Sequence, residues 1–387
     1  MTARSPGGVL EVSLDVSAVP GRPAGAGRYV LELARALARR DDCGLALLAR
    51  RDDAARWRQI ATGERVFAVA PSPRLARLVY EQTRLASVVA CLGPPPVGVH
   101  HGPHYTMPRR SKVPCVVTVH DMTFFDHPEW HEPSKVAWFR AAIRHSAGHA
   151  AVIICVSETT AARLRDVLAP RCPVVAVSHG VDHARFLAEE PGPGADRKVL
   201  EGLGVSRPYV LHLGTLEPRK GVVDLVAAFD RLTRERGDLE LVLAGGNGWK
   251  SRPVLHSIAT ARSSGRIRRL GYVPEAVVPA LLRGARAVVY PSLEEGFGLP
   301  ALEALACGAP LVTTLGTSMA ELAGDSALLV PARQPEALAA AIEAAISEEP
   351  STDKAGRRAR GLAVAARYTW EACAQGHMDA YRVAAGG

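Results

Sequence analysis

Short apolar runs alternate along the chain with segments whose apolar residues recur every three or four positions. The runs predict buried strands, and the segments between them predict amphipathic helices. The first half of the chain contains the runs Val9–Val16, Leu45–Ala49, Val66–Val69, Cys115–Val119, Val152–Val156 and Val174–Val177. The second half contains Tyr209–Leu213, Leu239–Ala244, Ala287–Tyr290, Leu311–Thr313 and Ala327–Val330. Repeated strand-then-helix order predicts an α/β protein with two Rossmann-like, doubly wound parallel sheets.

The segment between the two series has the composition of a linker. Its stretch Glu189–Gly194 contains two prolines and two glycines and no apolar side chain. We therefore expect a first Rossmann-like domain over residues 1–187, a linker over 188–207 and a second such domain over 208–365. Helical periodicity also covers Pro335–Ser347 and Arg357–Val383, and residues 366–387 are expected to form a C-terminal helix that crosses back to the first domain. Open parallel sheets bind ligands beyond the carboxyl ends of their strands, so the two domains are expected to face a cleft there.

Composition excludes several classes of protein. At roughly 150 residues per domain, 387 residues suit two domains. Hydrophobic residues make up 48% and charged residues 22%, as in folded proteins rather than low-complexity chains. The seven cysteines show neither C-x-x-C nor Cys/His spacing, which excludes a disulfide framework and argues against a metal site. Because the chain has no leader pattern and no apolar run of about 18 residues, we expect it in the cytoplasm.

The net charge of +8 lies mainly before residue 190. A basic first half suits a phosphorylated acceptor or peripheral association with the inner membrane face. Nucleic acid is the weakest candidate partner, because the chain has neither zinc-finger spacing nor a long basic run.

The most informative motif is Tyr290–Gly308, where a buried strand is followed by a glycine loop and a helix with Pro300 near its start. Backbone amides and the helix dipole attract an anion at such a position. Glu295 precedes the loop and Glu303 lies in the helix, so two carboxylates can bind the hydroxyls of a ribose and a hexose. Alternatively, Glu303 is a favourable charge near the helix start and Glu295 is solvated. The loop consists of Gly296, Phe297, Gly298 and Leu299.

A second motif joins the strand Tyr209–Leu213 to the predicted helix Val222–Arg236. It has the sequence Gly214-Thr215-Leu216-Glu217-Pro218-Arg219-Lys220-Gly221. Cations at a helix N-terminus oppose the dipole, so Arg219 and Lys220 indicate a bound anion such as a diphosphate. The alternative is a solvated basic turn.

In the first half, Gly25 and Gly27 follow the strand Val9–Val16 and open a helix over Tyr29–Ala38. These glycines suit backbone approach to a phosphate or sugar. The motif does not match the dinucleotide fingerprint, because Val30 replaces its third glycine.

His120 and Asp121 follow the strand Cys115–Val119, which places His120 at the expected cleft. A histidine there can bond a substrate hydroxyl or move a proton, or it can simply be held by Asp121. Further histidines are expected to line an acceptor site: His100, His101 and His104.

The segment Arg74–Leu92 predicts one helix with a broad apolar side and arginines outside it. Such a helix either packs in the ordinary way with a solvated basic face or lies on an anionic membrane.

Taken together, these motifs resemble retaining glycosyltransferases of family four, which have the GT-B fold. The stretch from Glu295 to Glu303 is similar to the E-x7-E motif of that family, and Gly214–Lys220 is similar to its phosphate-binding turn. A closer resemblance to the bacterial mannosyltransferases of O-antigen-type polysaccharides depends on Gly25–Tyr29, Gly102–Tyr105, His120, Asp121, Phe124, Pro128 and Glu129.

The resemblance implies transfer of a hexose, with mannose first, from a nucleotide diphosphate sugar to an acceptor hydroxyl, with retention and without an essential metal or other cofactor. GDP-mannose is the first donor candidate, and the acceptor is a carbohydrate, a lipid-linked molecule or a small molecule. By the same resemblance Glu303 binds the ribose, Arg219 and Lys220 the diphosphate, and Glu295 the hexose. The resemblance also implies that His120 contacts the donor sugar near the reacting centre. It implies further donor contacts for Gly27, Gly214, Gly296, Phe297, Gly298 and Leu299.

Two stretches depart from the pattern of the family. Ser178–Asp182 stands in place of Pro-Asn-Gly-Val-Asp, and Ser318–Glu321 in place of Ser-x-Pro-Glu. Three other functions stay open: a catalytically silent partner that binds a sugar nucleotide, an NAD(P)-dependent oxidoreductase, and a phosphorylase or epimerase of the same fold. The failed dinucleotide fingerprint argues against the oxidoreductase.

Overall fold

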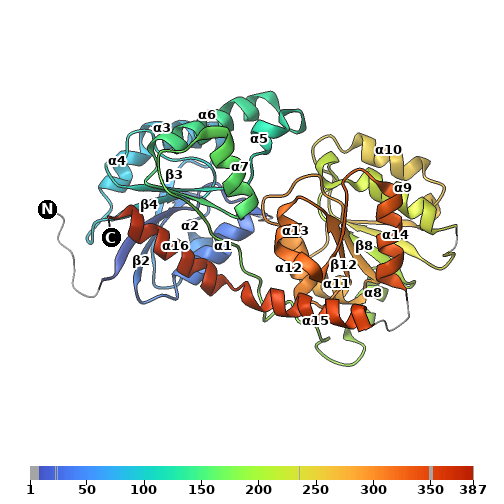
Figure 1. Cartoon of the computed structure of the whole chain (residues 1–387). Coiled ribbons are helices and arrows are strands. Elements are labelled where there is room, and N and C mark those ends of the chain that lie inside the picture. Colours follow the sequence, from blue (N-terminus) through green and yellow to red (C-terminus); the bar gives the residue numbers. More distant parts are fainter. Residues whose placement is uncertain (1–7, 22, 24, 235, 348–351, 387) are drawn as a thin grey trace. The chain divides into compact units, whose positions relative to one another are not determined.

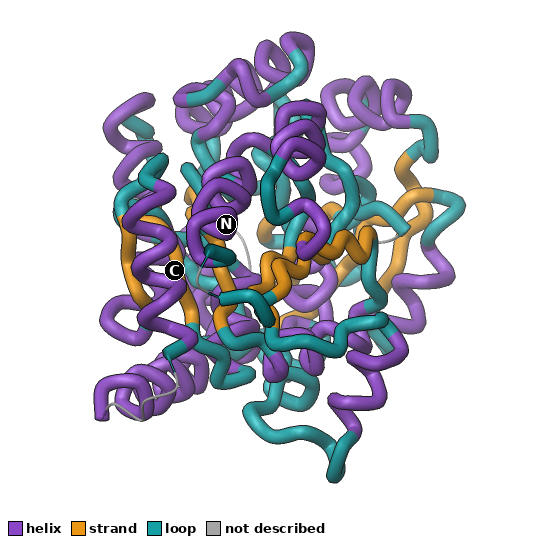
Figure 2. The backbone as a smooth tube through the Cα atoms, turned by 90° about the vertical axis from the view of Figure 1, so that its right-hand side faces the viewer, coloured by secondary structure: helices purple, strands orange, loops and turns teal. Residues whose placement is uncertain are grey.

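The computed structural model describes residues 8–21, 23, 25–234, 236–347 and 352–386 (Figure 1). The chain divides into two compact units. The first unit comprises residues 1–128, 132–180 and 370–387, and the second comprises 129–131 and 181–369. Within the units, helices flank the strands, which is the layering of a doubly wound fold (Figure 2).

The first unit is built on a parallel sheet of seven strands in the order β3-β2-β1-β4-β5-β6-β7. The strands are β1 (Leu10–Asp15), β2 (Cys43–Arg50), β3 (Arg65–Ala70), β4 (Val99–Gly102), β5 (Cys115–Val119), β6 (Val152–Cys155) and β7 (Val174–Ala176). The helices are α1 (Ala26–Leu37), α2 (Ala54–Ile60), α3 (Arg74–Thr83), α4 (Leu85–Ala90), α5 (Thr123–Asp126), α6 (Pro133–His149), α7 (Glu158–Leu168) and α16 (Trp370–Ala384).

The second unit has a parallel sheet of six strands in the order β10-β9-β8-β11-β12-β13. The strands are β8 (Tyr209–Leu213), β9 (Glu240–Ala244), β10 (Ile267–Gly271), β11 (Ala287–Tyr290), β12 (Leu311–Thr314) and β13 (Leu328–Val330). The helices are α8 (Ala195–Gly202), α9 (Val222–Leu232), α10 (Arg252–Thr260), α11 (Val278–Gly284), α12 (Leu299–Ala306), α13 (Ser318–Ala323), α14 (Pro335–Ile346) and α15 (Thr352–Arg367). Short 3₁₀ turns complete the unit, among them η2 (Pro218–Lys220).

Five local features differ from the sequence expectations. The pattern missed β4, because two adjacent histidines interrupt its apolar run, and β10, because it carries two arginines. The predicted helix Arg74–Leu92 is two helices that meet at Arg84, and the C-terminal pattern is likewise divided into α15 and α16. The expected linker 188–207 contains α8, which packs against α11.

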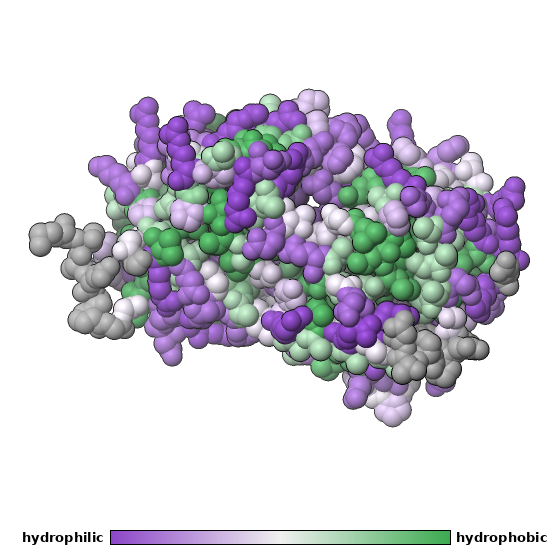
Figure 3. Space-filling model, viewed as in Figure 1, coloured by the Kyte–Doolittle hydropathy of each residue, from purple (hydrophilic) through white to green (hydrophobic). Residues whose placement is uncertain are grey.

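Helix α16 packs on the first unit, against α1 and the strands β5 and β6. Gly376 lets α16 approach Val177, which follows β7, because an added Cβ would lie 2.8 Å from Cγ1 of Val177. No helix among the described residues is both long and apolar enough to cross a bilayer. The face of the molecule in Figure 3 is largely polar, with patches of apolar side chains between the charged ones.

Candidate active site

The turn after β8 is locked against the end of β11. Gly221 has a left-handed φ of 64°, and an added Cβ would lie 2.0 Å from the carbonyl oxygen of Pro291. Only glycine fits this position, because both the conformation and the space exclude a side chain. The amide of Leu293 also donates to the carbonyl of Arg219 over 2.8 Å. The basic turn and the loop that carries Glu295 are thereby fixed next to each other.

Glu295 is the centre of a polar cluster in the second unit. Lys220 donates from Nζ to Oε1 of Glu295, and Nη1 of Arg219 lies 3.3 Å from Oε2. The hydroxyl of Ser292 donates to Oε1 over 3.0 Å. The hydroxyl of Ser318, at the start of α13, donates to the Glu295 carbonyl over 2.7 Å. Both carboxylate oxygens and the backbone of Glu295 are therefore held in one position.

The charges of this cluster determine its protonation. Burial alone would raise the pKa of Glu295, but the charges of Lys220 and Arg219 and the hydrogen bonds of Lys220 and Ser292 outweigh burial and lower it to about 2. Burial lowers the pKa of Lys220, and the charge of Glu295 opposes that effect. We conclude that Glu295 is ionised at neutral pH.

This cluster changes the interpretation of the basic turn. The sequence suggested that Arg219 and Lys220 oppose the helix dipole unless an external anion binds them. In the structure Glu295 supplies that negative charge, and Oε2 of Glu217 also lies 3.2 Å from Nε of Arg219. The dipole argument by itself therefore does not require a bound ligand.

The glycine loop leads into α12 as the sequence predicted. Gly298 precedes the helix with a φ of 97°, and an added Cβ would lie 2.3 Å from Cγ of Met319. Glu303, in the middle of α12, is 5% exposed, although a carboxylate in the first turns of a helix is usually solvated. Its charge contributes to raising the pKa of the buried Tyr290, after burial itself. The charges of Glu295 and Glu303 both act on Tyr290, at the end of β11.

One buried histidine near this cluster was missed by the sequence analysis. His212 lies within β8 and donates from Nδ1 to the carbonyl of Val289 in β11 over 2.9 Å. Burial lowers its pKa to about 4, so Nε2 is an acceptor at neutral pH. The only signal in the sequence was a histidine inside an apolar strand pattern.

In the first unit His120 follows β5, as predicted, and is 7% exposed. Its Nε2 donates to the carbonyl of Pro103 over 2.8 Å. Burial lowers the pKa of His120, while the Pro103 hydrogen bond and the charge of Asp121 oppose this effect. A neutral ring with its proton on Nε2 has an acceptor at Nδ1. His120 is thus prepared to accept a hydrogen bond from a hydroxyl.

Gly27 lies in the first turn of α1, which begins at Ala26 rather than at Tyr29. An added Cβ would come within 3.2 Å of Cβ of Pro23, so the position has little space. Residue 24 of the same motif lies outside the described residues.

The prediction that His100 and His101 line an acceptor site is wrong, because both are fully buried in β4. Nδ1 of His100 lies 2.9 Å from the hydroxyl of Ser13, and His101 bonds Thr118 and Tyr381. His104 packs against the rings of Tyr105, Phe139 and His120. Both strand histidines belong to the core because β4 lies between β1 and β5 in the sheet.

Comparison with known proteins identifies the family of the chain. The family model "Glycosyltransferase Family 4" matches residues 23–185, and "Glycosyl transferases group 1" matches residues 199–362. The chain is 33% identical over 289 residues to O-antigen chain mannosyltransferase B of Escherichia coli, covering 74% of each chain. The chain belongs to glycosyltransferase family 4. It is a glycosyltransferase.

Other relatives of this glycosyltransferase have names that give a different transferred sugar. Alpha-D-kanosaminyltransferase of Streptomyces kanamyceticus is 27% identical over 292 residues, which is 72% of each chain. The crystal structure of Anabaena HepE in complex with UDP and glucose superposes with a TM-score of 0.74 at 19% identity, covering 96% of this chain and 98% of HepE. That similarity, with the two parallel-sheet units, shows the GT-B fold of the glycosyltransferase.

The two units of the glycosyltransferase hold different predicted residues. The second unit contains the basic turn, Glu295, the glycine loop and Glu303, and the first contains Gly27 and His120. Among the described residues, no group of three or more His, Cys, Asp or Glu side chains is arranged to hold a metal ion.

Proposed function

We propose that this chain is a retaining hexosyltransferase that moves a sugar, mannose first, from a nucleotide diphosphate sugar to an acceptor hydroxyl. The observation that carries the proposal is the convergence of Lys220, Arg219 and Glu295 after two parallel strands of the second unit. Such strand ends are where open α/β sheets bind ligands. The mannose assignment is supported by the name of the O-antigen relative, and the nucleotide donor by the UDP bound to HepE.

The cluster suggests how a donor would bind. Lys220 and Arg219 contact Glu295 in the structure, and a diphosphate would offer both cations a more highly charged partner. Glu295 would then be released to accept hydrogen bonds from the hexose, close to the amides of Gly296, Phe297, Gly298 and Leu299. Gly214 would let the backbone approach the phosphates, and Glu303 would accept hydrogen bonds from the ribose.

The chemistry is stabilisation of the departing diphosphate. Fixed cations and loop amides placed where negative charge develops lower the barrier without reorganising at the moment of reaction. In this proposal Lys220 and Arg219 serve in place of a metal ion. His120 would accept a hydrogen bond at Nδ1 from a hydroxyl of the donor sugar, and Gly27 would approach the donor phosphate.

The first test is a thermal-shift panel of GDP, UDP and dTDP and their sugars, without added metal. A ligand that binds only the folded state raises the melting temperature. We expect a shift with one base, GDP first and UDP second, that is lost in Lys220→Ala and kept in Lys198→Ala. Lys198 is a matched control because it is exposed on α8 of the same unit. No shift with any nucleotide, for a folded protein, would contradict the donor site.

A second test separates binding from turnover. Glu303→Ala should weaken binding of the nucleotide about tenfold or more, because a buried acceptor for two hydroxyls is lost. Exposed Glu275, in the same unit, provides the matched control Glu275→Ala. Anomeric NMR of the product of the best donor then reports whether the reaction retains configuration. Nucleotide binding without any transfer would instead indicate a silent partner.

A further inference from the structure

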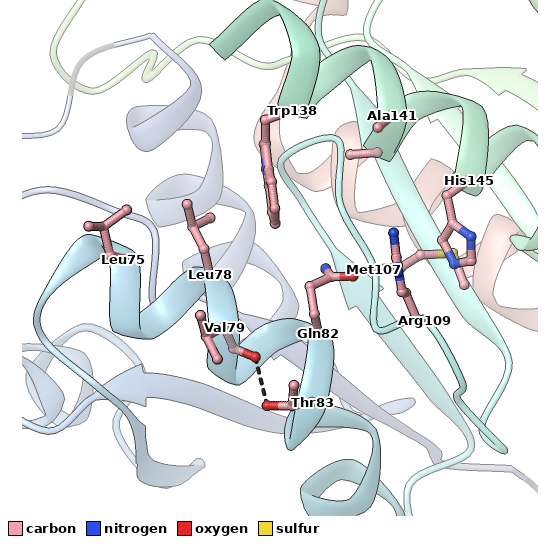
Figure 4. A pocket seen from close by; sticks show the side chains of 11 residues that line it. Leu75, Leu78, Val79, Gln82, Thr83, Met107, Arg109, Trp138, Ala141 and His145 are labelled. Carbon is pink, nitrogen blue, oxygen red and sulfur yellow. Dashed lines mark hydrogen bonds between the residues drawn. The ribbon is translucent and has the colours of Figure 1, made fainter. Parts of the chain in front are cut away.

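An apolar groove lies in the first unit between α3 and α6. Figure 4 shows side chains of both helices directed toward the same space, with the loop after β4 at one side. The cavity measures about 690 Å³, within the range of about 300 to 1,000 Å³ usual for small-molecule sites. Among its lining residues are Leu75, Leu78, Val79, Met107, Arg109 and Trp138.

The groove exposes apolar side chains to solvent. Leu75 is 78% exposed and Val79 is 62% exposed, both on the same face of α3. The indole of Trp138 projects from α6 toward them (Figure 4). Contiguous exposed apolar surface of this kind marks binding sites more often than chance.

Several unpaired cations lie on the segments that form the groove. Arg109 lines it, and Arg74, Arg84, Arg110 and Lys112 are exposed on α3 or on the two adjoining loops. Within the described residues none of these five side chains forms an ion pair. The acid of α3, Glu81, is buried rather than on this surface, and α6 contains no acidic residue. The groove therefore combines an apolar floor with a positive rim.

The loop that forms one side of the groove also contacts His120. The carbonyl of Pro103 accepts from His120, and the ring of Tyr105 lies 5.5 Å from that of His120. Two and four residues later, Met107 and Arg109 line the groove. The segment is fixed to α6, because the hydroxyl of Ser146 donates to the carbonyl of Tyr105 over 3.2 Å.

We propose that this groove binds a single hydrocarbon chain that ends in a phosphate or diphosphate, the anchor of a lipid-linked acceptor. This proposal rests on the proposed glycosyl transfer, since it names the class of the acceptor. The apolar floor buries the chain, which is favourable in proportion to the area removed from water. The cations of the rim pair with the phosphate, with Arg109 closest because it lines the groove itself.

The test is isothermal titration calorimetry with dodecyl phosphate below its micelle concentration. The variants are Val79→Glu, which places a charge in the apolar floor, and Arg109→Glu, which reverses the charge at the rim. Val383→Glu is the matched control, because Val383 is 53% exposed on α16 of the same unit. If Val79→Glu lowers expression, Leu75→Glu replaces it, since Leu75 is even more exposed.

We expect binding to the unchanged protein, a loss of about tenfold or more in affinity for Val79→Glu and Arg109→Glu, and no change for Val383→Glu. Dodecyl maltoside, which has the chain without the phosphate, should bind weakly, and inorganic phosphate should not bind measurably. Unchanged affinity in both groove variants would overturn the proposal. So would equally tight binding of dodecyl maltoside, or binding to phosphatidylglycerol vesicles without any binding of monomeric dodecyl phosphate.

The nucleotide thermal shift distinguishes failure of this site from failure of the proposed function. It should be the same in Val79→Glu, Arg109→Glu and the unchanged protein, because these residues belong to the first unit and the cluster around Glu295 to the second. A retained shift with no lipid binding refutes the groove alone. An absent shift in the unchanged protein refutes the donor site and removes the basis for a lipid-linked acceptor.

Discussion

Tyr29 of α1 donates a hydrogen bond of 2.8 Å to Nε2 of His377 in α16, across 348 residues of sequence. The direction of this hydrogen bond follows from the other partner of the His377 ring. Nδ1 of His377 lies 2.8 Å from the carbonyl of Cys373, which can only accept, so Nε2 of the neutral ring carries no proton. Burial lowers the pKa of His377 to about 4, which keeps the ring neutral.

The donor and acceptor of each hydrogen bond in a longer chain can be assigned in the same way. Because Tyr29 has used its proton, the hydroxyl of Thr118 must donate to it over 2.9 Å, and Nε2 of His101 must then donate to Thr118 over 2.8 Å. Nδ1 of His101 is left to accept from Tyr381 over 2.7 Å. Helix α16 is thereby attached to α1 through His377 and to β4 of the sheet through Tyr381. Tyr29 also packs edge-on against His120, with ring centroids 5.2 Å apart.

Breaking this chain should loosen α16. His377→Leu leaves the buried hydroxyl of Tyr29 without its acceptor, which costs about 1 to 3 kcal/mol. We expect faster amide hydrogen exchange within Trp370–Ala384 and little change in the second unit. Tyr29→Phe should give a similar effect, and the double variant less than the sum, since both remove one interaction. Tyr272→Phe, at an exposed tyrosine of the second unit, is the control. Unaltered exchange in α16 would show that apolar packing alone holds the helix.

The pair of Lys220 and Glu295 should give the stability of the protein a dependence on acid pH. The pKa of Glu295 is lowered from 4.5 to about 2 in the fold. The stabilising contribution of its ionised form is therefore complete above pH 4.5 and is lost as the pH falls toward 2. Glu295→Gln should reduce the fall in melting temperature over this interval. An equal fall in the unchanged protein and the variant would contradict the assignment.

Removing only the cation of this pair should be worse than removing both charges. Lys220→Met leaves the Glu295 carboxylate in a buried place with one cation fewer, a change that costs about 3 kcal/mol in comparable buried pairs. The double variant with Glu295→Gln should recover much of this loss. Glu343→Gln, in a surface pair with Arg236, should change stability by about 1 kcal/mol or less. A double variant as unstable as Lys220→Met would contradict the coupling.

Glu81 should give a second pH dependence, of opposite sign. Burial and then the charge of Asp15 raise its pKa from 4.5 to about 7, while Thr106, Arg77 and Gln82 oppose this shift. The folded state binds the proton more tightly than the unfolded chain, so stability decreases as the pH rises from about 4.5 to 7.

Glu81→Gln should accordingly stabilise the protein at pH 8, by about 1 to 3 kcal/mol, and much less at pH 4. Urea denaturation at the two pH values measures the difference. The exposed Glu132 of the same unit provides the control Glu132→Gln, which lacks this dependence. Equal stability of Glu81→Gln and the unchanged protein at pH 8 would show that Glu81 is ionised without cost.

His120 should affect turnover more than binding. His120→Ala removes an acceptor that the proposal places at the donor sugar, so we expect kcat to fall about a hundredfold and nucleotide affinity to stay within about twofold. Because burial lowers the pKa of His120, its protonation should reduce activity only at a lower pH than the pH at which an exposed histidine is protonated. His256→Ala, at an exposed histidine of the second unit, is the control for both measurements. Loss of nucleotide affinity in His120→Ala would assign the residue to binding instead.

The sequence by itself determined the fold class and most strands, because short apolar runs such as Cys115–Val119 and Ala287–Tyr290, alternating with helical segments, are typical of buried parallel strands. It also located the glycine loop and the basic turn, since Gly298 and Gly221 are required by backbone conformation and close approach. These signals depend on residues that are close together along the chain, so a single sequence contains them.

Only the tertiary structure decided which distant residues meet. Nothing in the spacing of Lys220 and Glu295, or of Tyr29 and His377, predicts that they are partners, because sheet order and helix docking bring them together. For the same reason His101 appeared to be a ligand residue, although β4 places it in the core between β1 and β5. The apolar groove, likewise, arises from two helices that are separated along the chain and adjacent in space. Burial and partner choice depend on packing between elements, which the order of residues does not record.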